Sequence, residues 1–199
     1  MQINGNTMVK KVFIVHGWEA HSQDEWYPWL KKELEKKGFQ VEVPQMPNTD
    51  GPEIGAWISL IKKKVGKPDA ETFFVGHSIG CQAILRYLET LPSGVKVGGA
   101  VFVAGWFHLT GLEIEEEKET AKPWLETPVD LANVKKHAKN FVAFFSDDDV
   151  FVPISDSRLF KEKLGAKIII KHKMGHFRVV DGIDKLPEVL NELLNMQNS

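Results

Sequence analysis

The chain has 199 residues, of which 43% are hydrophobic and 26% are charged, and its formal net charge is -2 at pH 7. This is the composition of an ordinary globular domain with a sizeable core, and a near-neutral charge gives no general attraction to nucleic acid or to an anionic membrane. Residues 1–8 lack the pattern of a signal peptide, no apolar run reaches the roughly 18 residues of a membrane span, and one cysteine allows no internal disulfide, so we expect a cytoplasmic protein.

Apolar runs of strand length alternate with amphipathic stretches along the chain. The expected strands are residues 11–15, 39–44, 72–75, 98–105, 141–145 and 167–171, and the expected helices are about 24–37, 53–65, 81–88, 155–164 and 187–196. The second strand stops at a proline, which favours an edge position. Alternating strands and helices predict the α/β class: a compact three-layer sandwich with a central, mostly parallel sheet of about six strands and helices on both faces.

One connection, residues 106–137, is longer than an ordinary loop of such a fold. Excursions of this length often form a cap over a binding site. The segment holds Trp106, Trp124 and the acidic run Glu115-Glu116-Glu117, which is more simply a solvated helix face than a cation site. We expect residues 1–199 to form a single domain with a cap insertion at about 106–137.

The motif Gly76-His77-Ser78-Ile79-Gly80 stands between the expected strand 72–75 and the helical pattern 81–88. A strand that turns abruptly into a helix strains its corner residue, and flanking glycines remove the Cβ atoms that would collide there. Ser78 would then present its hydroxyl as a nucleophile, which requires a base and an orienting acid. The alternative is a tight turn in which Ser78 only caps the helix. Cys81 is interpreted as a buried structural thiol rather than a second nucleophile.

Candidates for the acid and the base follow the last two expected strands. One strand ends in Ser146-Asp147-Asp148-Asp149, and the other is followed by a loop that contains His176. Because the carboxyl ends of parallel strands meet at one edge, where ligands bind, both loops are expected beside Ser78. The chain order of serine, aspartate and histidine is the order of triads in hydrolases built on such a sheet.

Among the seven histidines, His176 is the preferred base because it lies in a glycine-preceded loop beyond the last strand. The others are assigned to tight turns, to the strand end and to surface or cap segments: His16, His77, His172, His21, His108 and His137. Asp149 is the preferred acid because it lies furthest into its loop, and Asp148 is the alternative. A calcium site at the aspartates is disfavoured, since the later glutamate of that motif is missing.

Acyl transfer also requires N–H donors directed at the developing oxyanion. The amide of Ile79, at the expected helix start, is one candidate, and the amide of Trp18, in the turn after the first strand, is the other. Trp18, Trp106 and Trp124 are the expected walls of the substrate cleft. No cofactor and no metal ion are expected.

Four segments together resemble the α/β-hydrolase superfamily: His16-Gly17-Trp18, Gly76-His77-Ser78-Ile79-Gly80, Asp149-Val150-Phe151-Val152-Pro153 and Gly175-His176-Phe177. Within it, the chain resembles the small serine hydrolases related to retinoblastoma-binding protein 9, including their bacterial members. The resemblance spans almost the whole chain and implies a compact hydrolase core with a Ser78-Asp149-His176 triad. The Leu-x-Cys-x-Glu signature of the animal member is absent around Cys81, so its protein partner is not carried over.

The expected function is therefore a serine hydrolase that cleaves small-molecule carboxylic esters through an acyl-enzyme on Ser78. His176 would take the serine proton and later activate water, while Asp149 would orient His176. The same triad acting on a thioester or a short peptide is one alternative. The other is a non-catalytic binding protein with an apolar cleft. Neither nucleic acid nor a membrane is expected as a partner, and no protein partner is identified.

Overall fold

The computed structural model describes residues 9–197, so the start of the chain considered above, residues 1–8, lies outside the described part. The strands are β1 (Lys11–Val15), β2 (Gln40–Glu42), β3 (Thr72–His77), β4 (Val97–Val103), β5 (Ala138–Ser146) and β6 (Lys167–Lys171). The helices are α1 (Tyr27–Lys36), α2 (Ile54–Val65), α3 (Ile79–Glu89), α4 (Glu115–Glu126), α5 (Leu131–Val134), α6 (Asp156–Leu159) and α7 (Pro187–Met196), with the short helical turns η1 (Phe160–Leu164) and η2 (Val179–Asp181). Within these residues, none of the helices has both the length and the apolar character needed to cross a membrane.

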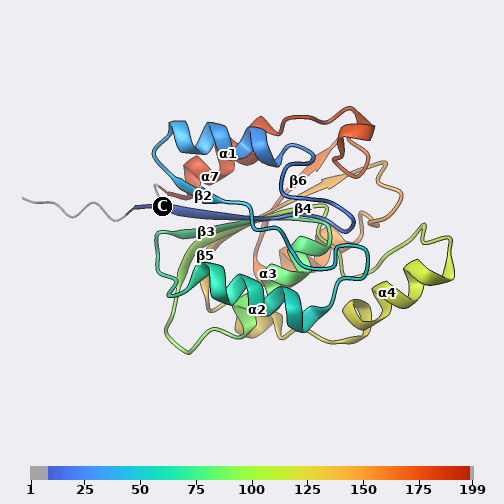
Figure 1. The fold of residues 1–199 in the computed structure, drawn as a ribbon, viewed down its shortest axis with the longest axis horizontal. Coiled ribbons are helices and arrows are strands. Elements are labelled where there is room, and N and C mark those ends of the chain that lie inside the picture. Colours follow the sequence, from blue (N-terminus) through green and yellow to red (C-terminus); the bar gives the residue numbers. More distant parts are fainter. Residues whose placement is uncertain (1–8, 198–199) are drawn as a thin grey trace, which may run out of the picture.

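The strands form one parallel sheet in the order β2-β1-β3-β4-β5-β6. Helices α1 and α7 cover one face, and α2 and α3 cover the other (Figure 1). This arrangement explains why β3 is buried along its whole length and reads as a continuous apolar run. The predicted three-layer α/β class and the edge position of β2 are both confirmed.

The strand register brings the ends of neighbouring strands together at one edge. Val15, the last residue of β1, pairs with Gly76 near the end of β3. Ser146, the last residue of β5, pairs with Lys171, the last residue of β6. The loops that carry the residues singled out in the sequence therefore leave the sheet side by side.

The predicted helix over residues 155–164 is interrupted in the structure. It consists of the short helix α6 followed by a wider π-helical turn, η1, which begins at Phe160. The Phe160 ring is fully buried and lies 5.4 Å from the Phe102 ring and 5.6 Å from the Phe145 ring, measured between centroids. A continuous amphipathic pattern in the sequence does not reveal this change of helical geometry.

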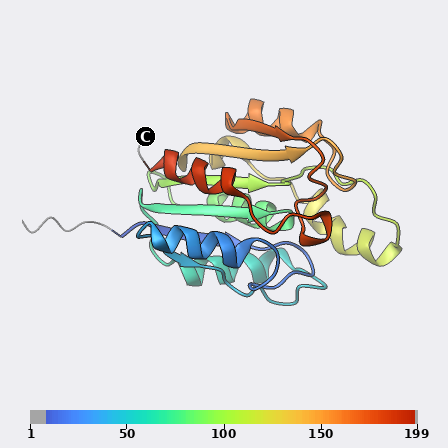
Figure 2. The same cartoon turned by 90° about the horizontal axis from the view of Figure 1, so that it is seen from above.

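The long connection contains α4 and α5, and Figure 2 shows α4 beyond the edge at which the strand arrows end. A buried arginine on α3 holds it there. The Arg86 guanidinium donates Nη2 hydrogen bonds of 2.8 Å to the Trp124 carbonyl and 2.7 Å to the Thr127 carbonyl, and it lies 5.5 Å from the centre of the Trp124 ring. A cation at the carboxyl end of α4 is electrostatically favourable. Burial lowers the Arg86 pKa to about 10, so the side chain stays charged at neutral pH.

The turn from β3 into α3 packs backbone against backbone on the end of β1. A Cβ atom on Gly80 would lie 2.2 Å from the Val15 carbonyl oxygen and 2.7 Å from the His16 carbonyl oxygen. A Cβ on Gly76 would lie 2.7 Å from the Cys81 amide nitrogen. Both glycines are therefore required by close approach of the main chain, as the sequence motif predicts.

Replacing Gly80 by alanine tests this packing. The new methyl group collides with backbone rather than with a movable side chain, so we expect the free energy of unfolding to fall by about 2 kcal/mol or more. Gly55→Ala in α2 is the matched control because a Cβ there meets no heavy atom within 4 Å. Alanine favours a helix over glycine, so this control should keep or gain stability. Equal denaturant midpoints for the two variants would contradict the account.

Candidate active site

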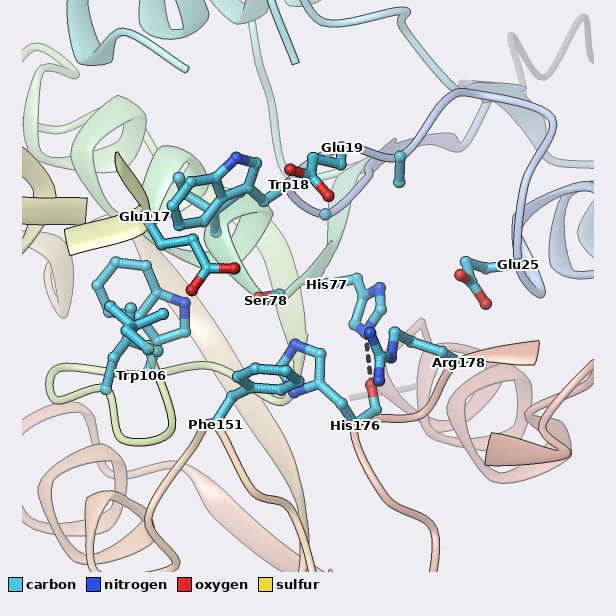
Figure 3. Close-up of a pocket in the computed structure, with 15 residues that line it drawn as sticks. Trp18, Glu19, Glu25, His77, Ser78, Trp106, Glu117, Phe151, His176 and Arg178 are labelled. Atoms are coloured by element: carbon cyan, nitrogen blue, oxygen red, sulfur yellow. Dashed lines mark hydrogen bonds between the residues drawn. The ribbon is translucent and has the colours of Figure 1, made fainter. Parts of the chain in front are cut away.

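Ser78 occupies the corner between β3 and α3 with an unusual backbone conformation. Its φ is 52° and its ψ is -121°, a region that non-glycine residues adopt at a cost of about 1–3 kcal/mol. Its amide donates a 2.9 Å hydrogen bond to the Val103 carbonyl on β4, which ties the corner to the sheet. The side chain makes no capping hydrogen bond to α3. The structure thus gives Ser78 no helix-capping role, and its side chain lines a cavity (Figure 3).

His176 and Asp149 lie against each other beside this cavity. The distance from His176 Nδ1 to Asp149 Oδ2 is 2.8 Å, and their side chains are only 9% and 2% exposed. The other carboxylate oxygen accepts the amides of Phe151 at 2.9 Å and Val152 at 3.1 Å. A carboxylate oxygen accepts the hydrogen bond, so the contact assigns the proton to Nδ1, and in this tautomer Nε2 is the nitrogen that can accept.

The two neighbouring aspartates have different partners. Asp148, the alternative acid, accepts hydrogen bonds from the Ser146 hydroxyl at 2.7 Å and the Gly175 amide at 2.9 Å, and these lower its pKa. Asp147 pairs with His172, with 2.6 Å between Oδ2 and Nδ1. Asp148 therefore braces the backbone of the loop that carries His176, whereas Asp149 contacts the imidazole itself.

Of the seven histidines, only His77 and His176 line the cavity. The remaining five make contacts elsewhere: His16 with Met46 and Gly17, His21 with Gln45, His108 with Asp156, His137 with Val95, and His172 with Asp147. His16 fits the bracing role expected from the sequence, because Nδ1 lies 2.9 Å from the Gly17 carbonyl and Nε2 lies 3.0 Å from the Met46 amide.

The amides of Trp18 and Ile79 are both without a hydrogen-bond acceptor in residues 9–197. Ile79 is the first residue of α3, where an amide has no partner within its helix. The turn that contains Gly17 lies against Ser78, since a Cβ on Gly17 would be in van der Waals contact with the Ser78 Cβ at 3.7 Å. Two free N–H groups thus belong to residues that line the cavity together with Ser78.

The cavity has a volume of about 190 Å³. Its apolar walls come from Trp18, Trp106, Leu109, Leu112 and Phe151, and its charged lining from Glu19, Glu25, Glu117 and Arg178. Figure 3 shows the Glu117 carboxylate between the two indoles, so one residue of the acidic run reaches the site rather than solvent alone. Among residues 9–197, no group of three or more His, Cys, Asp or Glu side chains could hold a metal ion.

Trp124 does not line this cavity, and its expected role as a wall needs correction. Its side chain is buried, its ring lies edge-on to Trp57 at 5.9 Å, and its indole N–H donates a 2.7 Å hydrogen bond to the Pro52 carbonyl. It packs the connection between β4 and β5 against α2 instead. A tryptophan in a long connection can serve either role, and the sequence has no signal that separates them.

Phe151 and Arg178 reach the site without having been singled out from the sequence. The Phe151 ring lies edge-on to His176 with 5.2 Å between centroids, and the Arg178 guanidinium lies 5.3 Å from the centre of the Phe151 ring. Phe151 belongs to the segment Asp149-Val150-Phe151-Val152-Pro153, in which the sequence indicates only Asp149 as a site residue. Only the folded loops show that this run shields one side of the imidazole.

His77 is buried next to Ser78 and is held neutral. Its Nδ1 lies 2.6 Å from the Tyr27 hydroxyl, and its Nε2 lies 2.8 Å from the His176 carbonyl. Burial is the main cause that lowers the His77 pKa to about 3, and nearby His176 adds to it.

This shift predicts a loss of stability in acid. Between pH 6.5, the ordinary histidine pKa, and about pH 3, the unfolded chain binds a proton that the folded chain excludes at His77. The stabilisation is complete above pH 6.5 and falls as the pH drops, by up to about 1.4 kcal/mol per unit. Urea midpoints from pH 7.5 to 4.5 should fall more steeply for the wild type than for His77→Gln, which cannot titrate. Parallel slopes would refute this.

Comparisons with known proteins agree with this geometry. The Serine hydrolase family model matches residues 12–195. YdeN of Bacillus subtilis is 33% identical over 187 residues, covering 94% of this chain and 95% of YdeN, and serine hydrolase RBBP9 of Rattus norvegicus is 27% identical over 77% of this chain and 78% of its own length.

Solved structures show the same fold. The crystal structure of the B. subtilis ydeN gene product has a TM-score of 0.88 at 30% identity, covering 96% of this chain and all of that one. Est1E of Butyrivibrio proteoclasticus with bound ferulic acid has a TM-score of 0.73 at 15% identity, covering 100% of this chain and 94% of its own. This chain therefore belongs to the serine hydrolase family and has an α/β-hydrolase fold, because the family model matches residues 12–195 and YdeN aligns along nearly its whole length.

Proposed function

We propose that this protein hydrolyses carboxylic esters through an acyl-enzyme on Ser78, with His176 as the base and Asp149 as the orienting acid. The observation that carries the proposal is the shared cavity: a serine hydroxyl on a strained corner and an imidazole buried against a carboxylate both line it. Membership of the serine hydrolase family supports serine-based chemistry. The ester bond and the roles of the three residues are our proposal.

In this mechanism the Ser78 hydroxyl oxygen attacks the ester carbonyl while His176 Nε2 takes its proton. The carbonyl oxygen becomes negatively charged and accepts hydrogen bonds from the free amides of Trp18 and Ile79. Asp149 stabilises the imidazolium, which then protonates the departing alcohol as the carbon–oxygen bond breaks. Water, deprotonated by His176, attacks the acyl-enzyme and releases the acid, which restores the serine hydroxyl.

The cavity supports substrates with a small or medium acyl group. Its volume of about 190 Å³ is close to the roughly 150 Å³ of an apolar protein cavity that admits benzene. Indole and phenyl side chains form much of the wall, which favours an apolar acyl chain over a polar one.

Labelling with a fluorophosphonate tests the nucleophile. The folded wild-type protein should gain one phosphonyl group on Ser78, and an activated ester such as p-nitrophenyl butyrate should show burst release of nitrophenol. Ser78→Ala should lose labelling and at least about 10³-fold of kcat. Ser157→Ala is the matched control. The Ser157 hydroxyl donates a 2.6 Å hydrogen bond to the Ile154 carbonyl, and Ser157 does not line the cavity. Turnover that survives in Ser78→Ala would overturn the assignment, and binding without a burst would favour a non-catalytic protein.

Two neighbouring aspartates allow a matched test of the acid. Asp149→Asn should lower kcat by about 10³- to 10⁴-fold, because an amide no longer fixes the proton of His176 on Nδ1. Asp148→Asn alters the hydrogen bonds to the Ser146 hydroxyl and the Gly175 amide, not the contact with the imidazole, and should retain kcat within about tenfold. Steady-state kinetics at neutral pH on both variants decides the matter. Equal losses, or a larger loss in the Asp148 variant, would show that the acid is assigned wrongly.

A further inference from the structure

We propose that Tyr27 and His77 act as positioning residues that hold the two halves of the site in register. They form a buried bridge between the oxyanion loop, residues 17–18, and the histidine loop, residues 175–177. This inference rests on the proposed hydrolysis. Tyr27 and His77 neither attack nor protonate the substrate, and they act by holding other groups in place. Three hydrogen bonds with fixed direction carry the argument.

The bridge runs from one loop to the other without a break. The Gly17 amide lies 3.1 Å from the Tyr27 hydroxyl, the hydroxyl lies 2.6 Å from His77 Nδ1, and His77 Nε2 lies 2.8 Å from the His176 carbonyl. Figure 3 shows the last of these contacts as a dashed line beside Ser78. Because His77 directly precedes Ser78, the middle of the bridge is fixed to the nucleophile by the main chain.

Chemistry at the two ends determines where every proton lies. An amide N–H can only donate and a carbonyl can only accept, so Gly17 donates to Tyr27, and His77 Nε2–H donates to His176. A neutral His77 then has Nδ1 free to accept the proton of the Tyr27 hydroxyl. The low pKa of His77 and the raised pKa of Tyr27, both mainly caused by burial, keep this arrangement of protons over the physiological range.

The bridge is closed to water, so its hydrogen bonds cannot be replaced by solvent. Tyr27 is fully buried and His77 is 2% exposed. The ring of Trp26 packs against both, with 4.8 Å to the Tyr27 centroid and 5.6 Å to the His77 centroid. Leaving a polar group unpaired at such a place is strongly unfavourable. The Tyr27 hydroxyl and the His77 ring therefore link the two loops, and within residues 9–197 neither has a hydrogen-bond partner outside the bridge.

A second hydrogen bond also holds the histidine loop. Phe177 has a φ of 59° and Gly175 a φ of 52°, so the backbone on both sides of His176 lies in the left-handed region. Trp26 Nε1 donates a 3.0 Å hydrogen bond to the Phe177 carbonyl, next to the carbonyl that His77 holds. Two adjacent carbonyls of a strained loop are thus tied to the region that also holds Gly17.

The bridge matters for catalysis because the reaction rate is sensitive to the relative position of the reacting groups. An error of about 1 Å in the relative position of reacting groups can cost roughly 10²-fold in rate. Without the bridge, the oxyanion amide of Trp18 and the imidazole of His176 would be set by separate loops that follow β1 and β6. We expect the bridge to influence the turnover rate rather than the affinity for substrate.

Tyr27→Phe removes the hydroxyl and keeps the ring that packs against Trp26. It should lower kcat by about 10- to 100-fold, with KM changed less than about threefold, in ester hydrolysis by the full chain. Tyr87→Phe is the matched control, because Tyr87 is also buried and its hydroxyl has no hydrogen-bond partner in the described part of the chain. It should retain wild-type kcat. An unchanged kcat in Tyr27→Phe would overturn the proposal.

The middle of the bridge offers a rescue experiment that separates positioning from packing. His77→Gln keeps an N–H for the His176 carbonyl and an oxygen for the Tyr27 hydroxyl, so it should recover at least about tenfold more kcat than His77→Leu. Equal losses in both variants would contradict a hydrogen-bonding role.

Amide hydrogen exchange gives a readout that does not depend on activity. Tyr27→Phe should speed exchange at Gly17 and in residues 175–177, while Tyr87→Phe should leave both at the wild-type rate. If the wild type neither labels with fluorophosphonate nor hydrolyses esters, the proposed function is wrong. The amide exchange rates would still test whether the bridge holds the loops. Unchanged exchange in Tyr27→Phe would show that the bridge does not hold the loops.

Discussion

The structure depends on the close contact between the β3–α3 turn and the end of β1. Gly80 lies so close to the Val15 and His16 carbonyls that not even a methyl group fits between them. This contact fixes the direction of α3, and with it the strained backbone of Ser78 and the free amide of Ile79. It also brings Gly17 beside Ser78, so that the turn after β1 and the turn after β3 share one small space. The geometry of the nucleophile is therefore imposed by main-chain packing and not by the serine itself.

Buried polar groups then connect this space to the rest of the sheet edge. Asp149 holds the ring of His176, Asp148 holds the Gly175 amide, and His77 holds the His176 carbonyl. Each of these side chains binds a different atom of the histidine loop, so hydrogen bonds hold both the ring of His176 and the backbone around it. On the opposite side of the sheet edge, Arg86 anchors the segment that supplies Trp106, Leu109 and Leu112 to the cavity. The cavity is thus formed by loops that are each tied to a rigid element.

Most of the fold could be predicted because its inner strands are buried on both faces. The run at residues 11–15 matches the buried strand β1. The run at 167–171 matches β6, a partly exposed edge strand that its three successive β-branched isoleucines favour. The bounds of β5 were harder, because Lys139 and Asn140 extend it beyond the apolar run. The π-helical turn at Phe160 could not be predicted, since it keeps the helical hydrophobic pattern.

The site could be predicted only in part. The glycines around Ser78 and the loop positions of Asp149 and His176 carry a local signal. The bridge through Tyr27 does not, because Tyr27 belongs to an amphipathic helix in which a buried aromatic residue is ordinary. A buried tyrosine hydroxyl requires a partner, yet nothing in the sequence says that the partner is 50 residues away. Trp124 is the converse case, a residue of suggestive type whose indole is committed to packing.

The most direct test is a crystal structure of the protein after reaction with a fluorophosphonate. We predict phosphorus bonded to Ser78 Oγ, a phosphonyl oxygen within hydrogen-bond distance of both the Trp18 and Ile79 amides, and His176 Nε2 turned towards Ser78 while Nδ1 keeps its contact with Asp149. A phosphonyl oxygen directed away from those amides, or an adduct on another residue, would contradict the assembled site on which the account rests.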